Sequence, residues 1–182
     1  MFFLILYVFA CLAALGVGGL AGWCDFKGMT IPNKLSLIII AAFFIAFGAA
    51  YMGEAEILGG LYSHFLAAVF VFIVTFLLFS LRLFGGGDSK LLTAYAFWFT
   101  PQNLIILLIY VSFLGALLGA LSLILKNRQV FKNVPEGSWL ARVQAGESVV
   151  PYGIPIVLGV FFAFVSQDYL APAKLLTFLV TG

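Results

Sequence analysis

Charged side chains are scarce in this sequence, and their scarcity defines its class. Of 182 residues, seven are Asp or Glu and nine are Lys or Arg, which together make 9% of the chain. A soluble domain carries about 25%. The basic residues form no cluster or stripe, so the chain lacks the electrostatic footprint of a nucleic-acid-binding protein. Hydrophobic residues make up 64%, and the mean hydropathy of +1.20 indicates an integral membrane protein.

Histidine and cysteine are also scarce, which excludes several kinds of site. The single histidine, His64, cannot form a two-His zinc site, and no HExxH sequence occurs. Cys11 and Cys24 have no CxxC spacing, so neither a disulfide framework nor a metal site is expected. A serine protease would need a base beside Ser89, but His64 lies at the far end of an apolar run and Lys90 is an adjacent residue that points elsewhere. We expect no metal and no cofactor.

Long apolar runs predict an all-α, polytopic membrane protein with about six transmembrane helices. About 20 helical residues, at roughly 1.5 Å each, cross the hydrocarbon core, and runs of this length exclude a transmembrane barrel. The fourth run is short and dips part-way or spans a thinned region. The predicted helices cover residues 2–23, 35–52, 57–84, 91–99, 104–125 and 152–165. We expect them to form a single membrane domain over residues 1–182.

Helix-capping and helix-breaking residues predict where some of these helices begin and end. Asn33 follows a proline and is expected to be the N-cap of the second helix. The glycine run Gly85 to Gly87 is expected to end the third helix, because glycine costs roughly 1 kcal/mol in a helix interior.

The basic residues fall in loops that six crossings place on one side of the membrane. These loops cover about residues 24–34, 82–90 and 126–151, and they hold eight of the nine Lys and Arg. The eight are Lys27, Lys34, Arg82, Lys90, Lys126, Arg128, Lys132 and Arg142. The opposite side has Lys174, Glu54, Glu56 and Asp168. The positive-inside rule therefore predicts cytoplasmic loops, with both termini outside the cytoplasm.

Asp25 and Asp88 are thereby predicted to share the cytoplasmic face. A carboxylate in hydrocarbon costs at least about 2.5 kcal/mol, so an acid at the end of an apolar run is a candidate functional group. Structural roles are also open, because Asp88 can cap a helix and Asp25 can be a solvated loop residue. Two neighbouring carboxyl groups share a proton and can act as base and acid in peptide hydrolysis. Since Asp88 precedes a helix and Asp25 follows one, we predict that Asp25 holds the proton.

Three segments carry a resemblance to prepilin peptidases, the type IV leader peptidase family. Residues 25–33, Asp-Phe-Lys-Gly-Met-Thr-Ile-Pro-Asn, resemble the first conserved segment of that family. Gly85, Gly87 and Asp88 match its Gly-x-Gly-Asp motif. Residues 150–153, Val-Pro-Tyr-Gly, are similar to the turn before the last helix in short members that serve Tad or Flp pilus systems.

The resemblance implies an aspartic endopeptidase of the bacterial cytoplasmic (inner) membrane. Its substrates would be prepilin or pseudopilin precursors, cut where a basic leader joins a hydrophobic helix, with Asp25 and Asp88 as the catalytic pair. Other residues of the two motifs would support the site or position the substrate, namely Gly85, Gly87, Lys27, Lys90, Pro32 and Asn33. The glycines can equally form a hinge, and the lysines can equally anchor the chain to lipid. Larger members also methylate the new amino terminus, but this chain lacks their loop with two CxxC pairs, so methyltransferase activity is not predicted.

Other functions stay open from the sequence. A transporter or a pilus-assembly subunit would use intramembrane acids, but these are expected near mid-span rather than at the interface. A presenilin-like protease shares Gly-x-Gly-Asp, although its companion aspartate lies within a span and not in a turn with Ile-Pro-Asn.

Overall fold

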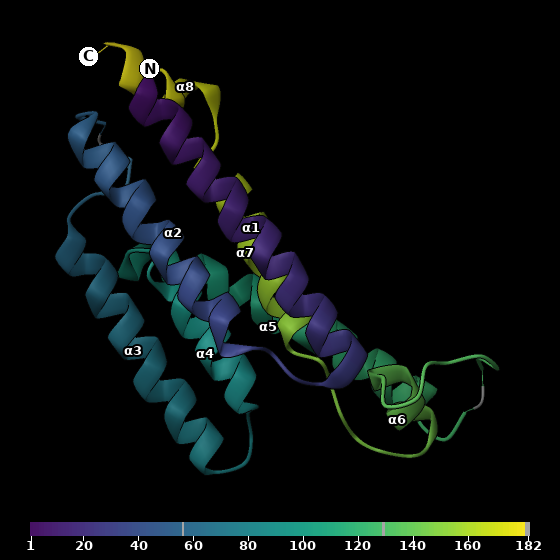
Figure 1. Ribbon diagram of the computed structural model, residues 1–182. Helices are drawn as coiled ribbons and strands as arrows, with labels where there is room; N and C mark the ends of the chain where they lie inside the picture. The colour runs from purple at the N-terminus through teal and green to yellow at the C-terminus, as the bar shows by residue number, and fades with distance from the viewer. Residues whose placement is uncertain (56, 129, 181–182) are drawn as a thin grey trace.

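Long apolar helices form a bundle. The computed structural model describes residues 1–55, 57–128 and 130–180, and all regular secondary structure in these ranges is helical (Figure 1). Four helices are long and apolar enough to cross a membrane, namely α1 (Phe2–Gly28), α2 (Asn33–Met52), α3 (Leu61–Ser80) and α5 (Pro101–Leu125). Two shorter ones are α4 (Gly86–Ala96) and α7 (Gly153–Ser166). The predicted polytopic all-α fold, with its short fourth helix, is confirmed.

The remaining helices are short. They are α6 (Trp139–Gln144), α8 (Pro172–Leu175) and α9 (Thr177–Val180). Helices of the bundle alternate in direction, so both termini lie at one end and the segments 29–32, 81–85 and 126–152 at the other (Figure 1). We call this second end the basic end, because the eight basic residues named above belong to it. Glu56, which was predicted on the opposite side, lies outside the described residues.

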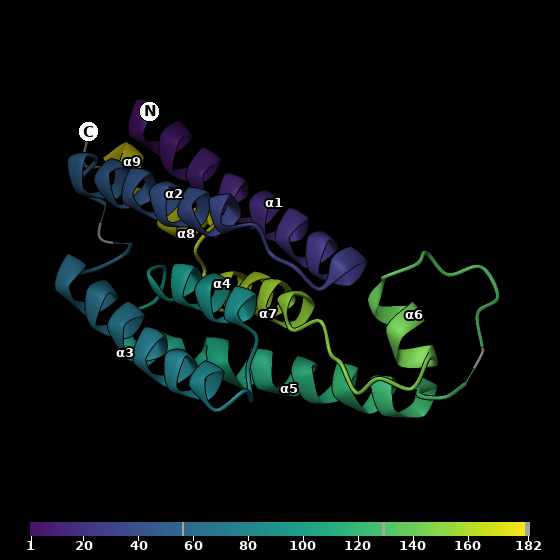
Figure 2. The ribbon, with the colours of Figure 1, turned by 60° about the horizontal axis from the view of Figure 1, so that its bottom comes forward.

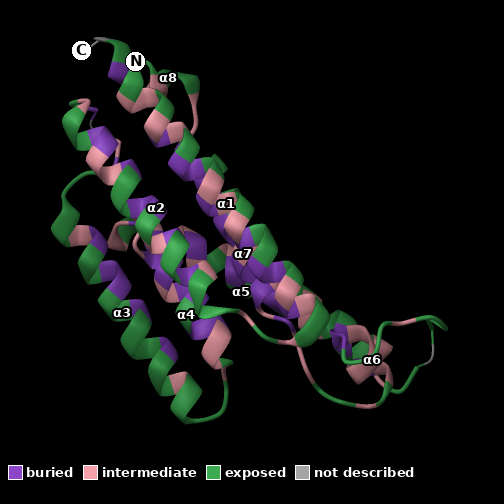
Figure 3. Ribbon diagram, viewed as in Figure 1, coloured by how far each residue is buried: buried purple, intermediate pink, exposed green. Residues whose placement is uncertain are grey.

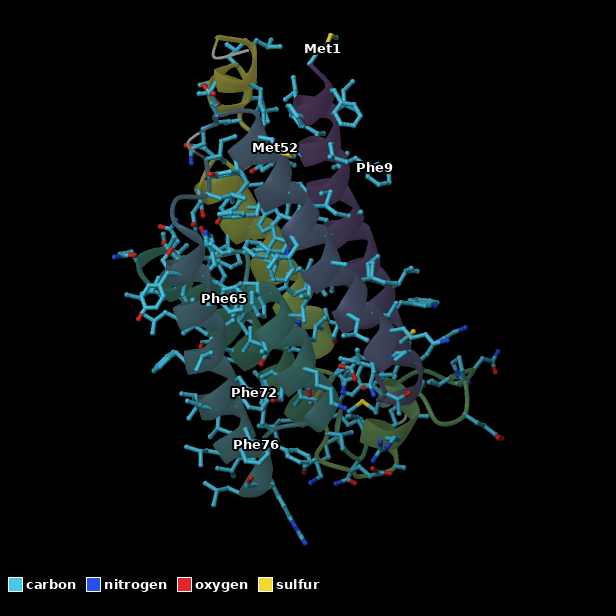
Figure 4. All side chains as sticks on the ribbon, turned by 60° about the vertical axis from the view of Figure 1, so that its left-hand side comes forward. Met1, Phe9, Met52, Phe65, Phe72 and Phe76 are labelled. Atoms are coloured by element: carbon cyan, nitrogen blue, oxygen red, sulfur yellow. The ribbon has the colours of Figure 1, made fainter. Side chains whose placement is uncertain are left out.

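Three layers make up the bundle. Figure 2 shows α4 and α7 between a layer of α1 and α2 and a layer of α3 and α5. Buried residues gather around α4 and α7, whereas the outer helices carry exposed apolar residues (Figure 3). Phe9 of α1 and Phe72 and Phe76 of α3 project outward (Figure 4) and are more than half exposed. Such a surface suits a lipid environment.

The turn between α4 and α5 lies inside the bundle rather than at one of its ends (Figure 1). Trp98 and Phe99 in this turn are fully buried. Two residues that follow α7 bond to the main chain here. The Tyr169 hydroxyl donates to the Trp98 carbonyl in the turn, and the Gln167 side-chain amide donates to the Asn103 carbonyl in the first turn of α5 at 3.1 Å. An irregular main chain among apolar helices requires such partners.

The glycine run starts a helix instead of ending one, which corrects the predicted boundaries. Helix α3 ends at Ser80, and Arg82 adopts a left-handed conformation with φ of 59° in the turn that follows. Gly85 is the N-cap of α4, and Asp88 lies in its first turn and not at the cap. Glycine is tolerated there because the first helical turn makes few internal hydrogen bonds.

The turn between α1 and α2 also differs from the prediction. Helix α1 continues to Gly28, so Asp25 lies within its last turn and not beyond its end. Pro32 occupies the N-cap of α2, and Asn33 is the first helical residue. The Asn33 side chain does not cap its helix, because its Oδ1 accepts a hydrogen bond from Lys90 Nζ at 2.9 Å.

Gly18 lets α1 approach α4, and replacing it with alanine is expected to destabilise the fold. A Cβ atom at Gly18 would lie 1.8 Å from the Tyr95 hydroxyl, which donates to the Ala14 carbonyl at 2.8 Å. Overpacking of this kind lowers the free energy of unfolding by about 1–3 kcal/mol. Gly19→Ala is the control, since nothing lies within 4 Å of that position. Thermal unfolding in detergent should show a lower melting temperature for Gly18→Ala only, and equal values would contradict the packing described.

Candidate active site

A cavity of about 590 Å³ lies at the basic end, and both Asp25 and Asp88 line it. Its walls come from three connecting segments that are far apart in the sequence. These are residues 29–31, residues 82–87, and residues 148–150 together with Tyr152. The two acids that the sequence placed on one face therefore meet in one cavity.

Asp25 is held by the beginning of a different helix. Its side chain is 4% exposed, and its Oδ2 accepts a hydrogen bond from the Gly153 N–H at 2.8 Å. Gly153 is the first residue of α7, so the carboxylate faces a helix N-terminus, where main-chain N–H groups and the helix dipole favour negative charge. A Cβ atom at Gly153 would lie 2.9 Å from Asp25 Oδ2, so only glycine permits this approach.

Asp88 has surroundings that favour its neutral form. It is 9% exposed, and its Oδ1 is buried with no hydrogen-bond partner in the described part of the chain. Burial, and after it the negative charge of Asp25, raise the pKa of Asp88 to about 7. Asp88 precedes the apolar part of α4 and lies outside the four long helices. The two acids are thus close enough to interact, and burial adds to their mutual repulsion in opposing the ionisation of Asp88.

Contacts around α4 fix its N-terminus against the neighbouring helices. Lys90 is bonded to Asn33 of α2, as described above, and Ser89 Oγ donates to Thr75 Oγ1 of α3 at 2.8 Å. Gly87 faces Ile31, where a Cβ atom would approach the Ile31 side chain to 3.3 Å. These contacts hold the Asp88 turn in position from two sides.

The predicted supporting residues divide into two groups. Gly85, Gly87 and Lys90 line the cavity, and a Cβ atom at Gly85 would collide with the Asp88 carboxyl at 2.4 Å. The other three do not line it, namely Lys27, Pro32 and Asn33. The Lys27 ammonium group instead lies over the Trp23 ring, 5.3 Å from its centroid.

Several residues at the cavity were not singled out as site residues from the sequence. Gly153 is the main-chain partner of Asp25, and the Pro-Tyr-Gly turn before α7 is the only sequence signal that marks it. Arg82 adds a second cation beside Lys90, and Phe84 and Tyr152 add a pair of aromatic rings. A contact across 128 positions cannot be read from local patterns.

The cavity suits acid and base chemistry on a polypeptide. It places two carboxyl groups in unlike surroundings and is large enough for several residues of an extended chain. Within the described residues, no three His, Cys, Asp or Glu side chains come together as a metal site would require. A larger cavity of about 880 Å³ lies between α2 and α3 at the opposite end, but it is mostly apolar and contains neither aspartate.

Comparison with known proteins identifies a family for this chain. A family model described as the type IV leader peptidase family matches residues 12–120, which is more than half of the chain and includes both aspartates. No curated protein and no solved structure matches significantly. The matched range ends before Gly153 and α7.

Proposed function

Since this chain belongs to the type IV leader peptidase family, we propose that it is an aspartic endopeptidase that removes the basic leader from prepilin or pseudopilin precursors. The cut would be made at the cytoplasmic face of the bacterial inner membrane, where the leader joins an apolar helix. The whole chain, residues 1–182, would act as one peptidase domain of the short kind that serves Tad or Flp pili. The observation that carries the aspartic mechanism is that Asp25 and Asp88 line one cavity in unlike surroundings.

The contacts support Asp25 as the base and Asp88 as the acid, the reverse of the assignment predicted from the sequence. That prediction considered only the helix adjacent in sequence to each aspartate, whereas the N-terminus of α7 faces the Asp25 carboxylate. Ionised Asp25 would take a proton from water as the water oxygen attacks the scissile carbonyl carbon. Protonated Asp88 would donate its proton to the carbonyl oxygen. Asp25 would then give the proton taken from water to the leaving amine as the C–N bond breaks, and a hydroxyl of the tetrahedral intermediate would return a proton to Asp88.

The cavity wall also supports binding of an extended peptide. The main-chain groups of Ser148 and Val150 make no hydrogen bond within the described part of the chain. Val149 between them is anchored, because its carbonyl accepts from Trp139 Nε1 at 3.0 Å. A substrate segment in extended form could pair with these open groups and lie beside the glycines at Asp88. Pairing of this kind would keep the scissile bond out of a helix.

Leader removal from a prepilin tests the function directly. The chain is expressed with a prepilin in cells that have no other leader peptidase, and the pilin amino terminus is read by mass spectrometry. A single shortened product that requires this chain supports the proposal. If every prepilin tested stays intact although the chain is inserted in the membrane, the proposal is overturned.

The cleavage rate is expected to fall above about pH 7. The active form needs protonated Asp88, and its pKa of about 7 means that this form is lost as the pH rises through neutrality. A pH-rate profile with purified chain and prepilin in detergent measures this limb. A rate that stays level from pH 6 to 9 would contradict the assignment of the proton to Asp88.

The pH dependence of thermal stability tests the raised pKa of Asp88 independently of catalysis. The folded chain binds the Asp88 proton more tightly than the unfolded chain does, because the pKa is raised from 3.8 to about 7. Wild type should therefore lose stability relative to Asp88→Asn between about pH 4 and 7, by up to about 1.4 kcal/mol per pH unit, and no further above that range. A melting-temperature difference between the two proteins that does not vary with pH would exclude the raised pKa.

A further inference from the structure

We propose that a groove between α3 and α5 receives the apolar helix of the substrate, and that the rings of Phe84 and Tyr152 form the gate between this groove and the aspartate cavity. The inference rests on the proposed function, because it assumes a substrate in which an apolar helix follows the cut bond. It assigns that helix a place on the surface of the chain.

The groove has a volume of about 350 Å³ and is lined mainly by residues of α3 and α5. Phe70 and Val74 of α3 and Ser112 and Ala116 of α5 line it and are exposed, so it is accessible from the lipid side.

Continuity with the aspartate cavity distinguishes this groove from an ordinary lipid-facing crevice. Phe84 and Tyr152 are the two residues that line both spaces. Their ring centroids are 5.5 Å apart with an interplanar angle of 59°, and both side chains are partly exposed. A chain that enters through this groove must therefore pass these rings to reach the acids.

The dimensions and chemistry of the groove fit the first turns of an apolar helix. Phe70 and Leu78 bound it along α3, and at roughly 1.5 Å per residue this corresponds to about two helical turns. Ser112 and Ala116 are one turn apart on α5, and their short side chains allow a helix to approach closely. The groove wall is also tied to the acid, because Thr75 is bonded to Ser89, the neighbour of Asp88.

Gly115 of α5 leaves room for the Tyr152 ring in its present position. A Cβ atom at Gly115 would lie 2.9 Å from Tyr152 Cε1, so alanine at this position must shift the ring. Gly119 is one helical turn further along α5, and a Cβ atom added there would meet nothing within 4 Å. The two glycines therefore give a matched pair of substitutions in the same helix.

Disulfide cross-linking tests the location of the substrate helix without requiring cleavage. The chain for this test carries Cys24→Ser, Asp25→Asn and Asp88→Asn, and Ser112→Cys is added to it. The protein is then oxidised in the presence of a prepilin that has one cysteine in the first two turns of its apolar helix. We expect at least about five times more cross-linked product than with Leu117→Cys, a position on α5 that is exposed but outside the groove. Equal yields at the two positions, or no product, would overturn the proposal and favour lipid as the occupant.

Cleavage by otherwise wild-type chains tests the gate. Gly115→Ala is expected to slow leader removal at least about tenfold with little change in melting temperature, and Gly119→Ala should stay within about twofold of wild type. Equal rates for the two variants would overturn the gate. If wild type itself cleaves no prepilin, the proposed function fails, and the cross-linking result still reports on the groove.

Discussion

Asparagine in place of either Asp25 or Asp88 is expected to lower the rate of leader removal by at least about a thousandfold. General acid and base groups contribute roughly 10² to 10⁴ each, and the amide of asparagine can neither accept the proton from water nor supply one to the carbonyl oxygen. The two acids act as a unit, so the double variant should be little slower than either single variant. The rate is measured with purified chain and prepilin, by the appearance of the shortened product.

Asp168→Asn is the matched control for these variants. Asp168 is exposed near the opposite end of the bundle, and its φ of 59° is a conformation that asparagine also adopts readily. Its replacement should leave the rate unchanged. Retention of more than a tenth of the wild-type rate by Asp25→Asn or Asp88→Asn would remove that residue from the chemistry.

Gly153→Ala is expected to reduce leader removal by about a hundredfold while both aspartates remain. A Cβ atom at this position would lie 2.9 Å from both Cβ and Oδ2 of Asp25, so the carboxylate must move away from the N–H group that holds it. A displacement of about 1 Å in a reacting group can cost on the order of a hundredfold in rate. Single-turnover kinetics in detergent, with the chain in excess over the prepilin, measure the loss at the chemical step.

Gly16→Ala provides the comparison for Gly153→Ala. Gly16 lies on α1, the helix that carries Asp25, and nothing is within 4 Å of the added atom. This variant should cleave at the wild-type rate. If Gly153→Ala did the same, the bond between α7 and Asp25 would have no part in catalysis.

Hydrophobicity was sufficient to predict the class of fold, because a membrane-spanning helix must be apolar over a length set by the bilayer. Charge bias went further and placed Asp25 and Asp88 at one end, where they do line one cavity. Helix ends were less predictable. The glycines at 85–87 were expected to stop a helix, but contacts of Ser89 and Lys90 with α3 and α2 stabilise a helix that begins there.

The proton assignment could not be derived from the sequence, because it depends on a contact between distant segments. Local reasoning assigned Asp25 to the unfavourable end of its own helix. In the folded chain the same carboxylate meets the favourable end of α7, through a residue 128 positions away. Electrostatic surroundings of this kind follow from tertiary packing and not from neighbours in the chain.

The buried turn between α4 and α5 bears on ion leakage. A hydrolase inside a bilayer must admit water, and a water-filled path through the whole bundle would dissipate the membrane potential. The side chains of Trp98, Phe99 and Tyr169 fill the interior at this turn. The Tyr169 hydroxyl donates a hydrogen bond to the Trp98 carbonyl, which would otherwise need another donor such as water. Water that reaches the aspartates from the basic end therefore meets packed aromatic rings at this turn on its way to the opposite end, and such packing opposes ion leakage.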